Sequence, residues 1–297
     1  MVVVSISPWG QTGPYVDKGY RTSDMVASAM GGHMHLNGDP ERGPVRTTVP
    51  QAFAQANFQG SVGAMIALYA RGAVLDGAGQ HVDVSMQEAM ANAMDHAQQT
   101  WDIRHANITG PGLYRNRGGI VLGRYLYEAS DGWVACLANG GLATPRGGAI
   151  IDWLAEHGAA GELTKDEWRE KLPTQQPLTD DERTHIEEVL VAFCKKHTRE
   201  WLVQEAQSRG AGWAPVFSPR EIVESNQLAA RDYWVSVHHE DLGESFVYPG
   251  APWKLSATPW LQRGRAPSAG EHNEEVYGEL LGLDDAELRR LKMRMVV

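Results

Sequence analysis

One stretch rich in Ala and Gly, residues 51–74, constrains the fold more than any other part of the chain. It contains no proline, and its larger apolar residues, among them Phe53, Ile66 and Tyr69, recur near helical spacing. The pattern predicts one long helix, with Pro50 tolerated in the first turn because its missing N–H would be unpaired there. Small residues on several faces predict close packing all round, in the centre of the fold.

Extended segments flank this helix and indicate an α/β fold. Residues 2–6 form a continuous β-branched run, which is typical of a buried parallel strand, and residues 45–49 predict a short extended segment. After the glycine turn at residues 76–79, His81–Ser85 alternates as a second strand. The Pro- and Gly-rich loop after the first strand stands where open α/β sheets place ligands. A plain connecting loop is the equal alternative.

Two helix starts are marked by capping residues. Ser23 is a candidate N-cap for a short helix over residues 23–30, and Ser85 with Glu88 three residues later predicts another helix start. We expect this second helix to continue to about His105. Its predicted buried face consists of residues that recur near every fourth position: Met86, Met90, Met94, Ala97 and Trp101.

The chain after residue 106 changes in character. Residues 107–119 read as a turn-rich linker, and Ser130-Asp131-Gly132 predicts a hairpin turn. Helices are expected near residues 148–157, 164–171, 180–196, 199–208, 271–281 and 283–295, with capping boxes at Thr164/Glu167 and Thr179/Glu182 and a Pro at the first position of a helix after Ser218. We predict four parts: residues 1–106, the linker 107–119, a small α+β domain 120–240, and a return to the large domain over 241–297.

Composition narrows the possible function. The formal net charge is -10 and the sequence pI is about 5.6, which disfavours nucleic acid as a main partner. Cys136 and Cys194 are far apart and read as small buried hydrophobes of a cytoplasmic protein. His33 and His35 lack further ligands at metal spacing, so no metal site is predicted. No apolar run reaches the roughly 20 residues of a membrane helix, and no membrane association is expected.

The order of segments is more specific than any single motif. ISPWGQTGPY, then DMVASAMGG and HLNGDPERGPV, precede the long helix and DGAGQHVDVSMQEA. The segment GAGWAPVFSPREI and the tail TPW…APSAGEHNEEVYGELLG follow later in the chain. Together they resemble the family III CoA-transferases, the relatives of carnitine and formyl-CoA transferases and of α-methylacyl-CoA racemase.

The resemblance implies a Rossmann-like large domain built from both chain ends, with a smaller α+β domain inserted, and an interlocked homodimer. It implies acyl-CoA and a carboxylic acid as substrates and no tightly bound cofactor. Members of the family normally carry a further section before ISPWGQTGPY, which supplies part of the Rossmann half and of the CoA pocket. We therefore expect either a clipped start, a partner chain that supplies this half, or an incomplete pocket.

The resemblance also implies where the chemistry should lie. The transferases use an Asp near the start of the long helix as nucleophile, and the matching position here is Phe53; no Asp or Glu occurs between Arg42 and Leu75. The racemases add a His, whose matching position is Ser23. The CoA-contacting loop maps to Arg21, Thr22, Ser23 and Asp24. Arg21 either pairs with a CoA phosphate or is an exposed structural residue, and Asp24 either belongs to the CoA loop or caps its own helix.

Three functions stay open. The first is CoA transfer through a different carboxylate, from a partner subunit, the further N-terminal section or the small domain. The second is a non-catalytic acyl-CoA-binding protein or the partner subunit of a heteromeric transferase, which the bulky Phe53 favours. The third and weakest is a racemase or isomerase that moves a proton at the α-carbon.

Overall fold

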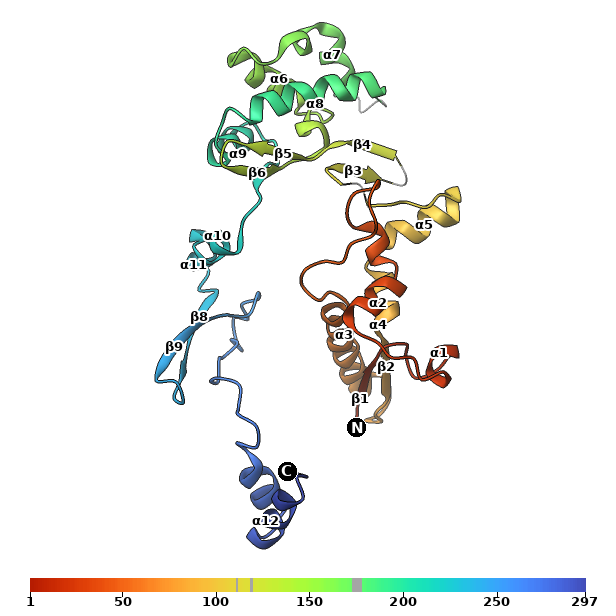
Figure 1. Cartoon of the computed structure of the whole chain (residues 1–297), viewed down its shortest axis with the longest axis vertical. Helices are drawn as coiled ribbons and strands as arrows, with labels where there is room; N and C mark the ends of the chain where they lie inside the picture. Colours follow the sequence, from red (N-terminus) through yellow and green to blue (C-terminus); the bar gives the residue numbers. More distant parts are fainter. Residues whose placement is uncertain (111, 118–119, 173–177) are drawn as a thin grey trace. The chain divides into compact units, whose positions relative to one another are not determined.

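The computed structural model of the chain describes residues 1–110, 112–117, 120–172 and 178–297 (Figure 1). It shows a mixed α/β protein with two compact units, Met1–Val216 and Phe217–Val297. The α/β prediction is confirmed. The Rossmann-like topology, the interlocked dimer and the four predicted parts stay predictions.

The N-terminal section of the first unit is a pair of parallel strands covered by a long helix (Figure 1). The strands pair in register from Val3 opposite His81 to Ser7 opposite Ser85, so both carboxyl ends lie together. Residues 45–49, predicted to be extended, form no strand. The elements are β1 (Val3–Ser7), α1 (Pro14–Asp17), α2 (Asp24–Met30), η1 (His33–Leu36), α3 (Ala52–Ala73), β2 (His81–Ser85), α4 (Met86–Asn92) and α5 (Asp95–Arg104).

Small residues bring α3 very close to the two strands. A Cβ atom added to Gly60 would lie 2.8 Å from Ile6 Cδ1, and one added to Gly63 would lie 2.8 Å from Val82 Cγ1. Such distances are shorter than real Cβ contacts allow, so glycine is what permits this approach. The predicted long helix is confirmed, although Pro50 precedes the N-cap residue Gln51 rather than lying in the first turn.

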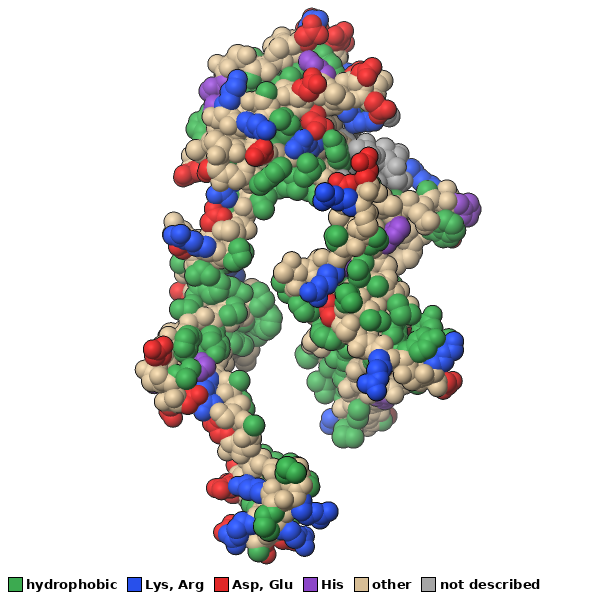
Figure 2. Space-filling view, viewed as in Figure 1, with side chains coloured by type: hydrophobic (Ala, Val, Ile, Leu, Met, Phe, Trp, Pro, Cys, Tyr) green, Lys and Arg blue, Asp and Glu red, His purple; other side chains and the backbone are tan. Residues whose placement is uncertain are grey.

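The expectation that α3 is packed on all sides is wrong for this chain. Its buried residues are small, whereas Tyr69 is 77% exposed. The small residues form the contact with the strands, and the large ones lie on the outer side, where Figure 2 shows apolar side chains at the surface of this section. The exposed large side chains of α3 are Phe53, Phe58, Val62, Met65, Ile66, Leu68 and Tyr69.

The second helix predicted after the glycine turn is two helices. α4 ends at Asn92 and α5 begins at Asp95, with a turn between them. Because this break rotates the later residues away from the face of α4, Met90 is fully buried but Trp101 is 53% exposed. The expectation that Trp101 continues a buried stripe is therefore wrong.

The remainder of the first unit encloses the largest core of the described residues. Trp153 and Trp213 lie at its centre with their rings 5.6 Å apart, and Trp213 Nε1 donates to the carbonyl of Gly140 over 2.9 Å. Strands β5, β6 and β7 form an antiparallel sheet, as the predicted hairpin requires. The elements are β3 (Tyr114–Arg117), β4 (Ile120–Arg124), β5 (Leu126–Ala129), β6 (Gly132–Ala135), η2 (Ala138–Gly141), α6 (Gly147–Glu156), η3 (Gly161–Thr164), α7 (Asp166–Lys171), α8 (Asp180–Cys194), α9 (Arg199–Ser208) and β7 (Ala214–Pro215).

The capping predictions have different outcomes in this region. Thr179 and Glu182 form the predicted capping box at the start of α8. The predicted box at Thr164 is wrong, because Thr164 ends the short helix η3 and Lys165 is the N-cap of α7. Cys194 is buried in the core and Cys136 is half-buried against it, and both are free thiols.

The second unit is a hairpin with short helices. Strands β8 and β9 pair antiparallel, and Ser218 with Glu221 forms a full capping box with Pro219 at the helix start, as predicted. Among the described residues of the chain, no helix has the length and apolar character needed to cross a membrane. The elements are α10 (Pro219–Val223), α11 (Asn226–Ala230), β8 (Trp234–His239), β9 (Glu244–Pro249), the π-helix η5 (Glu274–Leu280) and α12 (Asp285–Met293).

The tight contact between α3 and the strands predicts a matched pair of glycine variants. Gly60→Ala should lower the free energy of unfolding by about 1–3 kcal/mol, because the new methyl group overpacks against Ile6. Gly72→Ala, in the same helix with nothing within 4 Å of its Cβ position, should raise it by up to about 1 kcal/mol. Urea unfolding measures both, and equal shifts would contradict the close packing.

Two neighbouring histidines at the edge of the core, His157 and His197, predict a pH dependence. The His197 ring stacks on Trp201 at 4.0 Å and lies 5.8 Å from the His157 ring. Burial, and then the charges of His157 and Lys196, hold the pKa of His197 below its usual range. The unfolded chain therefore takes up this proton first as pH falls, and stability is lost below about pH 6.5.

We expect the free energy of unfolding to fall between pH 7.5 and pH 5.5, and to fall less in His197→Phe, which keeps an aromatic ring against Trp201 but cannot titrate. Urea unfolding at both pH values measures the difference. The same pH dependence in the two proteins would show that His197 is not responsible.

Candidate functional site

The loop after β1 lies at the carboxyl ends of both parallel strands. The backbone N–H of Gln11 donates to Asp83 Oδ2 of β2 over 2.8 Å, which ties the loop to the sheet. Trp9 Nε1 and Ser7 Oγ are buried without a hydrogen-bond partner among the described residues. Unpaired buried polar groups are costly and require an explanation. A ligand or another chain at this end of the sheet would provide one.

The predicted CoA-contacting residues follow this loop and the one-turn helix α1 (Pro14–Asp17). Ser23 caps α2, because its Oγ accepts the N–H of Val26 over 3.3 Å, as predicted. Thr22 Oγ1 donates to the carbonyl of Ser23. Arg21 is exposed and forms no ion pair with any of the described residues, so its guanidinium is available to an anion. The four residues are therefore contiguous at the start of α2.

Asp24 does not cap its own helix. Its Oδ1 accepts the N–H of Phe53 over 3.0 Å and its Oδ2 accepts the N–H of Gln51 over 3.3 Å. The first N–H groups of a helix have no partner within the helix, and its dipole favours a negative charge there. Asp24 therefore caps α3 across about 30 residues of sequence, and of the two alternatives for Asp24 the one in which it caps its own helix is wrong.

Phe53, the position where the nucleophile was expected, lies in the first turn of α3. Its side chain is 41% exposed, and its neighbour Ala52 is fully buried. The carboxylate of Asp24 lies against its backbone. The structure thus brings Phe53 and Asp24 together, and no Asp or Glu side chain comes from α3 itself.

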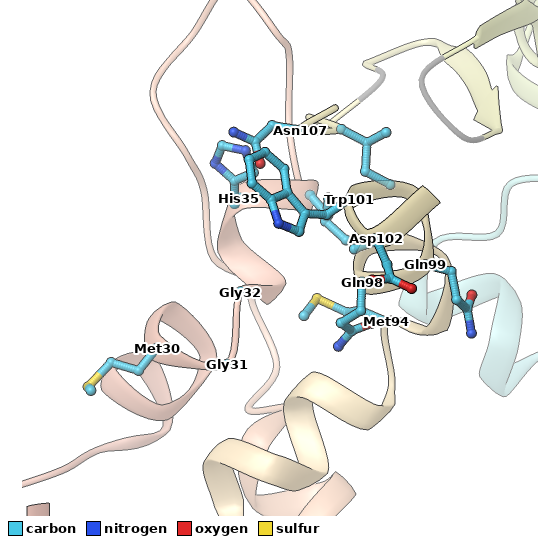
Figure 3. Close-up of a pocket in the computed structure, with 13 residues that line it drawn as sticks. Met30, Gly31, Gly32, His35, Met94, Gln98, Gln99, Trp101, Asp102 and Asn107 are labelled. Carbon is cyan, nitrogen blue, oxygen red and sulfur yellow. The ribbon is translucent and has the colours of Figure 1, made fainter. Parts of the chain in front are cut away.

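A cavity of about 750 Å³ opens at the other end of α2. Figure 3 shows His35, Trp101 and Asn107 close together on one side of it, with Met94 and Gln98 beneath Trp101. This volume is in the range of small-molecule sites. The described lining contains apolar and neutral polar residues, one Asp and one His, but no Lys or Arg: Met30, Gly31, Gly32, His35, Leu36, Met94, Ala97, Gln98, Gln99, Trp101, Asp102, Asn107 and Ile108.

Glycine shapes the floor of this cavity. A Cβ atom added to Gly31 would lie 2.5 Å from Met90 Cβ. Gly32 has a backbone φ of +87°, which residues with a side chain rarely adopt. No motif in the sequence pointed to this cavity. The break between α4 and α5 creates it, and the turn residues at 93 and 94 gave no proline or glycine signal for that break.

A smaller cavity of about 320 Å³ lies where β2 passes into α4. Its lining includes Asp83 and Glu88, both exposed, and Gln59 of α3. Asp83 is held by the N–H of Gln11. Two carboxylates therefore lie near the sheet end in addition to Asp24.

The structure is that of an α/β protein with a loop at the carboxyl ends of two parallel strands. A sequence profile of CoA-transferase family III matches residues 1–273. The chain belongs to this family, and the predicted resemblance is confirmed.

Named relatives agree with this assignment. The chain is 30% identical over 292 residues to the succinyl-CoA:(R)-benzylsuccinate CoA-transferase subunit BbsE of Thauera aromatica, covering 94% of this chain and 65% of the relative. It is 31% identical to a formyl-CoA:oxalate CoA-transferase of Streptomyces coelicolor, covering 100% of this chain and 71% of the relative. The chain thus spans about two thirds of the length of these relatives.

Solved structures share the fold. A CAIB/BAIF family protein from Brucella suis superposes with a TM-score of 0.72 at 19% identity, over 94% of this chain and 68% of the other. A hypothetical protein from Mycobacterium tuberculosis superposes with a TM-score of 0.68 at 16% identity, over 93% of this chain and 68% of the other. At such identities the likeness concerns the fold alone.

Proposed function

We propose that the protein takes part in the transfer of CoA from an acyl-CoA to a carboxylic acid. The observation that carries the proposal is the family match over residues 1–273. Relatives named as a subunit of a succinyl-CoA:(R)-benzylsuccinate CoA-transferase and as a succinyl-CoA–D-citramalate CoA-transferase support an acid as the acceptor. The free thiols of Cys136 and Cys194 support a reducing, cytoplasmic setting.

The residues at the start of α2 form the proposed CoA-binding segment. Arg21 would pair with a phosphate of CoA, and Thr22, Ser23 and Asp24 would line the path beside it. The cavity at the other end of α2 suits an apolar acyl group rather than a phosphate, because no Lys or Arg occurs among its described lining residues. CoA and acyl-CoA enter as substrates, with no tightly bound cofactor.

A second function is supported by Phe53. A phenyl ring cannot attack a thioester, so this chain would be the non-catalytic, partner subunit of a heteromeric transferase. Relatives named as a subunit of benzylsuccinate CoA-transferase and as the alpha and beta subunits of malate CoA-transferase favour this arrangement. The exposed apolar side chains of α3 are suited to contact with another chain, whether a second copy or a different subunit.

A racemase or isomerase is the weakest alternative. Proton transfer at an α-carbon needs a base on each face of that carbon. Ser23 occupies the matching position of the racemase His, and its hydroxyl oxygen accepts the N–H of Val26. Neither Ser23 nor Phe53 provides a base.

The test of the proposed function is a transfer assay. The protein is incubated with succinyl-CoA and a panel of dicarboxylic and aromatic acids, and mass spectrometry follows the appearance of the new acyl-CoA. The methyl esters of the same acids, which cannot accept CoA, serve as controls. Transfer by the chain alone supports the enzyme, and transfer only after a second subunit is added supports the heteromeric alternative. Absence of CoA binding at millimolar concentration contradicts both.

The proposed phosphate contact predicts the behaviour of Arg21→Gln. Loss of one charged hydrogen bond corresponds to about 1.5–3 kcal/mol, so CoA should bind about tenfold more weakly or worse. Titration calorimetry with CoA at two salt concentrations measures this. Arg220→Gln, which removes another exposed arginine in the second unit, is the control. Equal affinities of the two variants would exclude Arg21 from the CoA site.

A further inference from the structure

We propose that Asp24 supplies the carboxylate nucleophile that α3 lacks. This inference rests on the proposed CoA transfer and goes beyond it by assigning the reacting group to α2. The starting observation is that Asp24 Oδ1 lies 3.0 Å from the backbone nitrogen of Phe53, the residue at which a nucleophile was expected. A carboxylate carried by the neighbouring helix α2 therefore lies at the start of α3.

The surroundings of Asp24 suit a reacting group. The residue is half-buried, so a substrate can reach it. Each carboxylate oxygen accepts one backbone N–H, from Gln51 or Phe53, and retains a further lone pair for attack. The cavity begins at Met30, six residues along α2, which corresponds to about 9 Å of helix. One short helix therefore carries the carboxylate at one end and the wall of an acyl-sized cavity at the other.

The proposed reaction balances without any oxidant or metal. An Asp24 oxygen attacks the thioester carbon of acyl-CoA; a C–O bond forms, the C–S bond breaks, and the electron pair leaves with the CoA thiolate. The thiolate then attacks Asp24 Cγ; a C–S bond forms, and the acyl group leaves as a carboxylate. The carboxylate of the acceptor acid attacks Asp24 Cγ; a C–O bond forms, the C–S bond breaks, and the CoA thiolate leaves. The thiolate then attacks the acceptor's carbonyl carbon in the resulting anhydride; a C–S bond forms, and Asp24 leaves as a carboxylate.

The hydrogen bond from Phe53 has a role in this sequence. When the thiolate attacks Cγ, negative charge develops on an oxygen of Asp24. The N–H of Phe53 already points at Oδ1, and a preorganised donor at the place where charge develops lowers the barrier. The start of α3, which carries Phe53 and no acidic residue, thus provides an oxyanion donor.

The rival interpretation is that Asp24 is only a helix cap. Asp24→Asn largely separates the two roles. Its amide oxygen can still accept the N–H of Phe53, only the longer bond from Gln51 is lost, and the amide is not a nucleophile for this step. The variant should lose no more than about 2 kcal/mol of stability, the range of a helix-cap change, and remain folded. Its transfer rate should fall by roughly a thousandfold or more, as for removal of other nucleophiles.

The experiment traps the intermediate on the full chain. Wild-type protein is incubated with succinyl-CoA, quenched with hydroxylamine and digested with trypsin, and the fragment of residues 22–42 is sequenced by mass spectrometry. That fragment contains Asp39 and Glu41 as internal comparison carboxylates. Asp39→Asn is the matched variant, because Asp39 Oδ1 also accepts a backbone N–H, that of Glu41 over 2.9 Å.

A hydroxamate on Asp24, absent from Asp39 and Glu41, together with lost transfer in Asp24→Asn and intact transfer in Asp39→Asn, supports the proposal. A label on Asp83, Glu88 or another carboxylate, or full transfer by Asp24→Asn, overturns the assignment of Asp24 and leaves the proposed function standing. Absence of transfer by the wild-type protein, alone or with a second subunit, overturns both together. Because the label is read on the wild-type chain, a folding defect in the variant does not decide the result.

Discussion

The structure of the N-terminal section depends on the contact between α3 and the parallel strands. Gly60 and Gly63 let the helix backbone approach Ile6 and Val82 so closely that no side chain would fit between them. Two parallel strands have few hydrogen bonds of their own, and parallel sheets require cover on their faces. The glycines of α3 therefore fix the position of the helix start, and with it the position of Phe53 beside Asp24.

Several features that depend on residues close together in the sequence were predicted correctly. The strand His81–Ser85, the N-cap Ser23 and the capping box at Thr179 depend on residues within four positions of each other, and each has its predicted form. The sequence also predicted the long helix, because α3 has a strong period and no breaker. The small residues of α3 predicted close packing on all sides. Sequence alone does not distinguish a helix face that packs on a sheet from a face that is exposed in this chain.

The candidate site was predicted only in part. Residues 21–24 were placed at a ligand loop from their resemblance to the family, and the structure keeps them together at the start of α2. The hydrogen bond from the Phe53 N–H to Asp24 joins residues 29 positions apart. The cavity wall at Trp101 results from a break between two helices at which the sequence has no proline or glycine. Neither feature has a local signature, because both arise from how separate helices pack.

Capping and nucleophilic attack make opposing demands on one carboxylate. Hydrogen bonds from the start of a 22-residue helix stabilise the anion of Asp24, which weakens it as a nucleophile in the ground state. The same N–H groups stabilise the charge that returns to its oxygens when Cγ is attacked. A carboxylate on α3 would have to fold back to reach these donors, whereas one on α2 faces them directly. The geometry that makes Asp24 a good cap is therefore also the geometry that suits the later steps of the proposed CoA transfer.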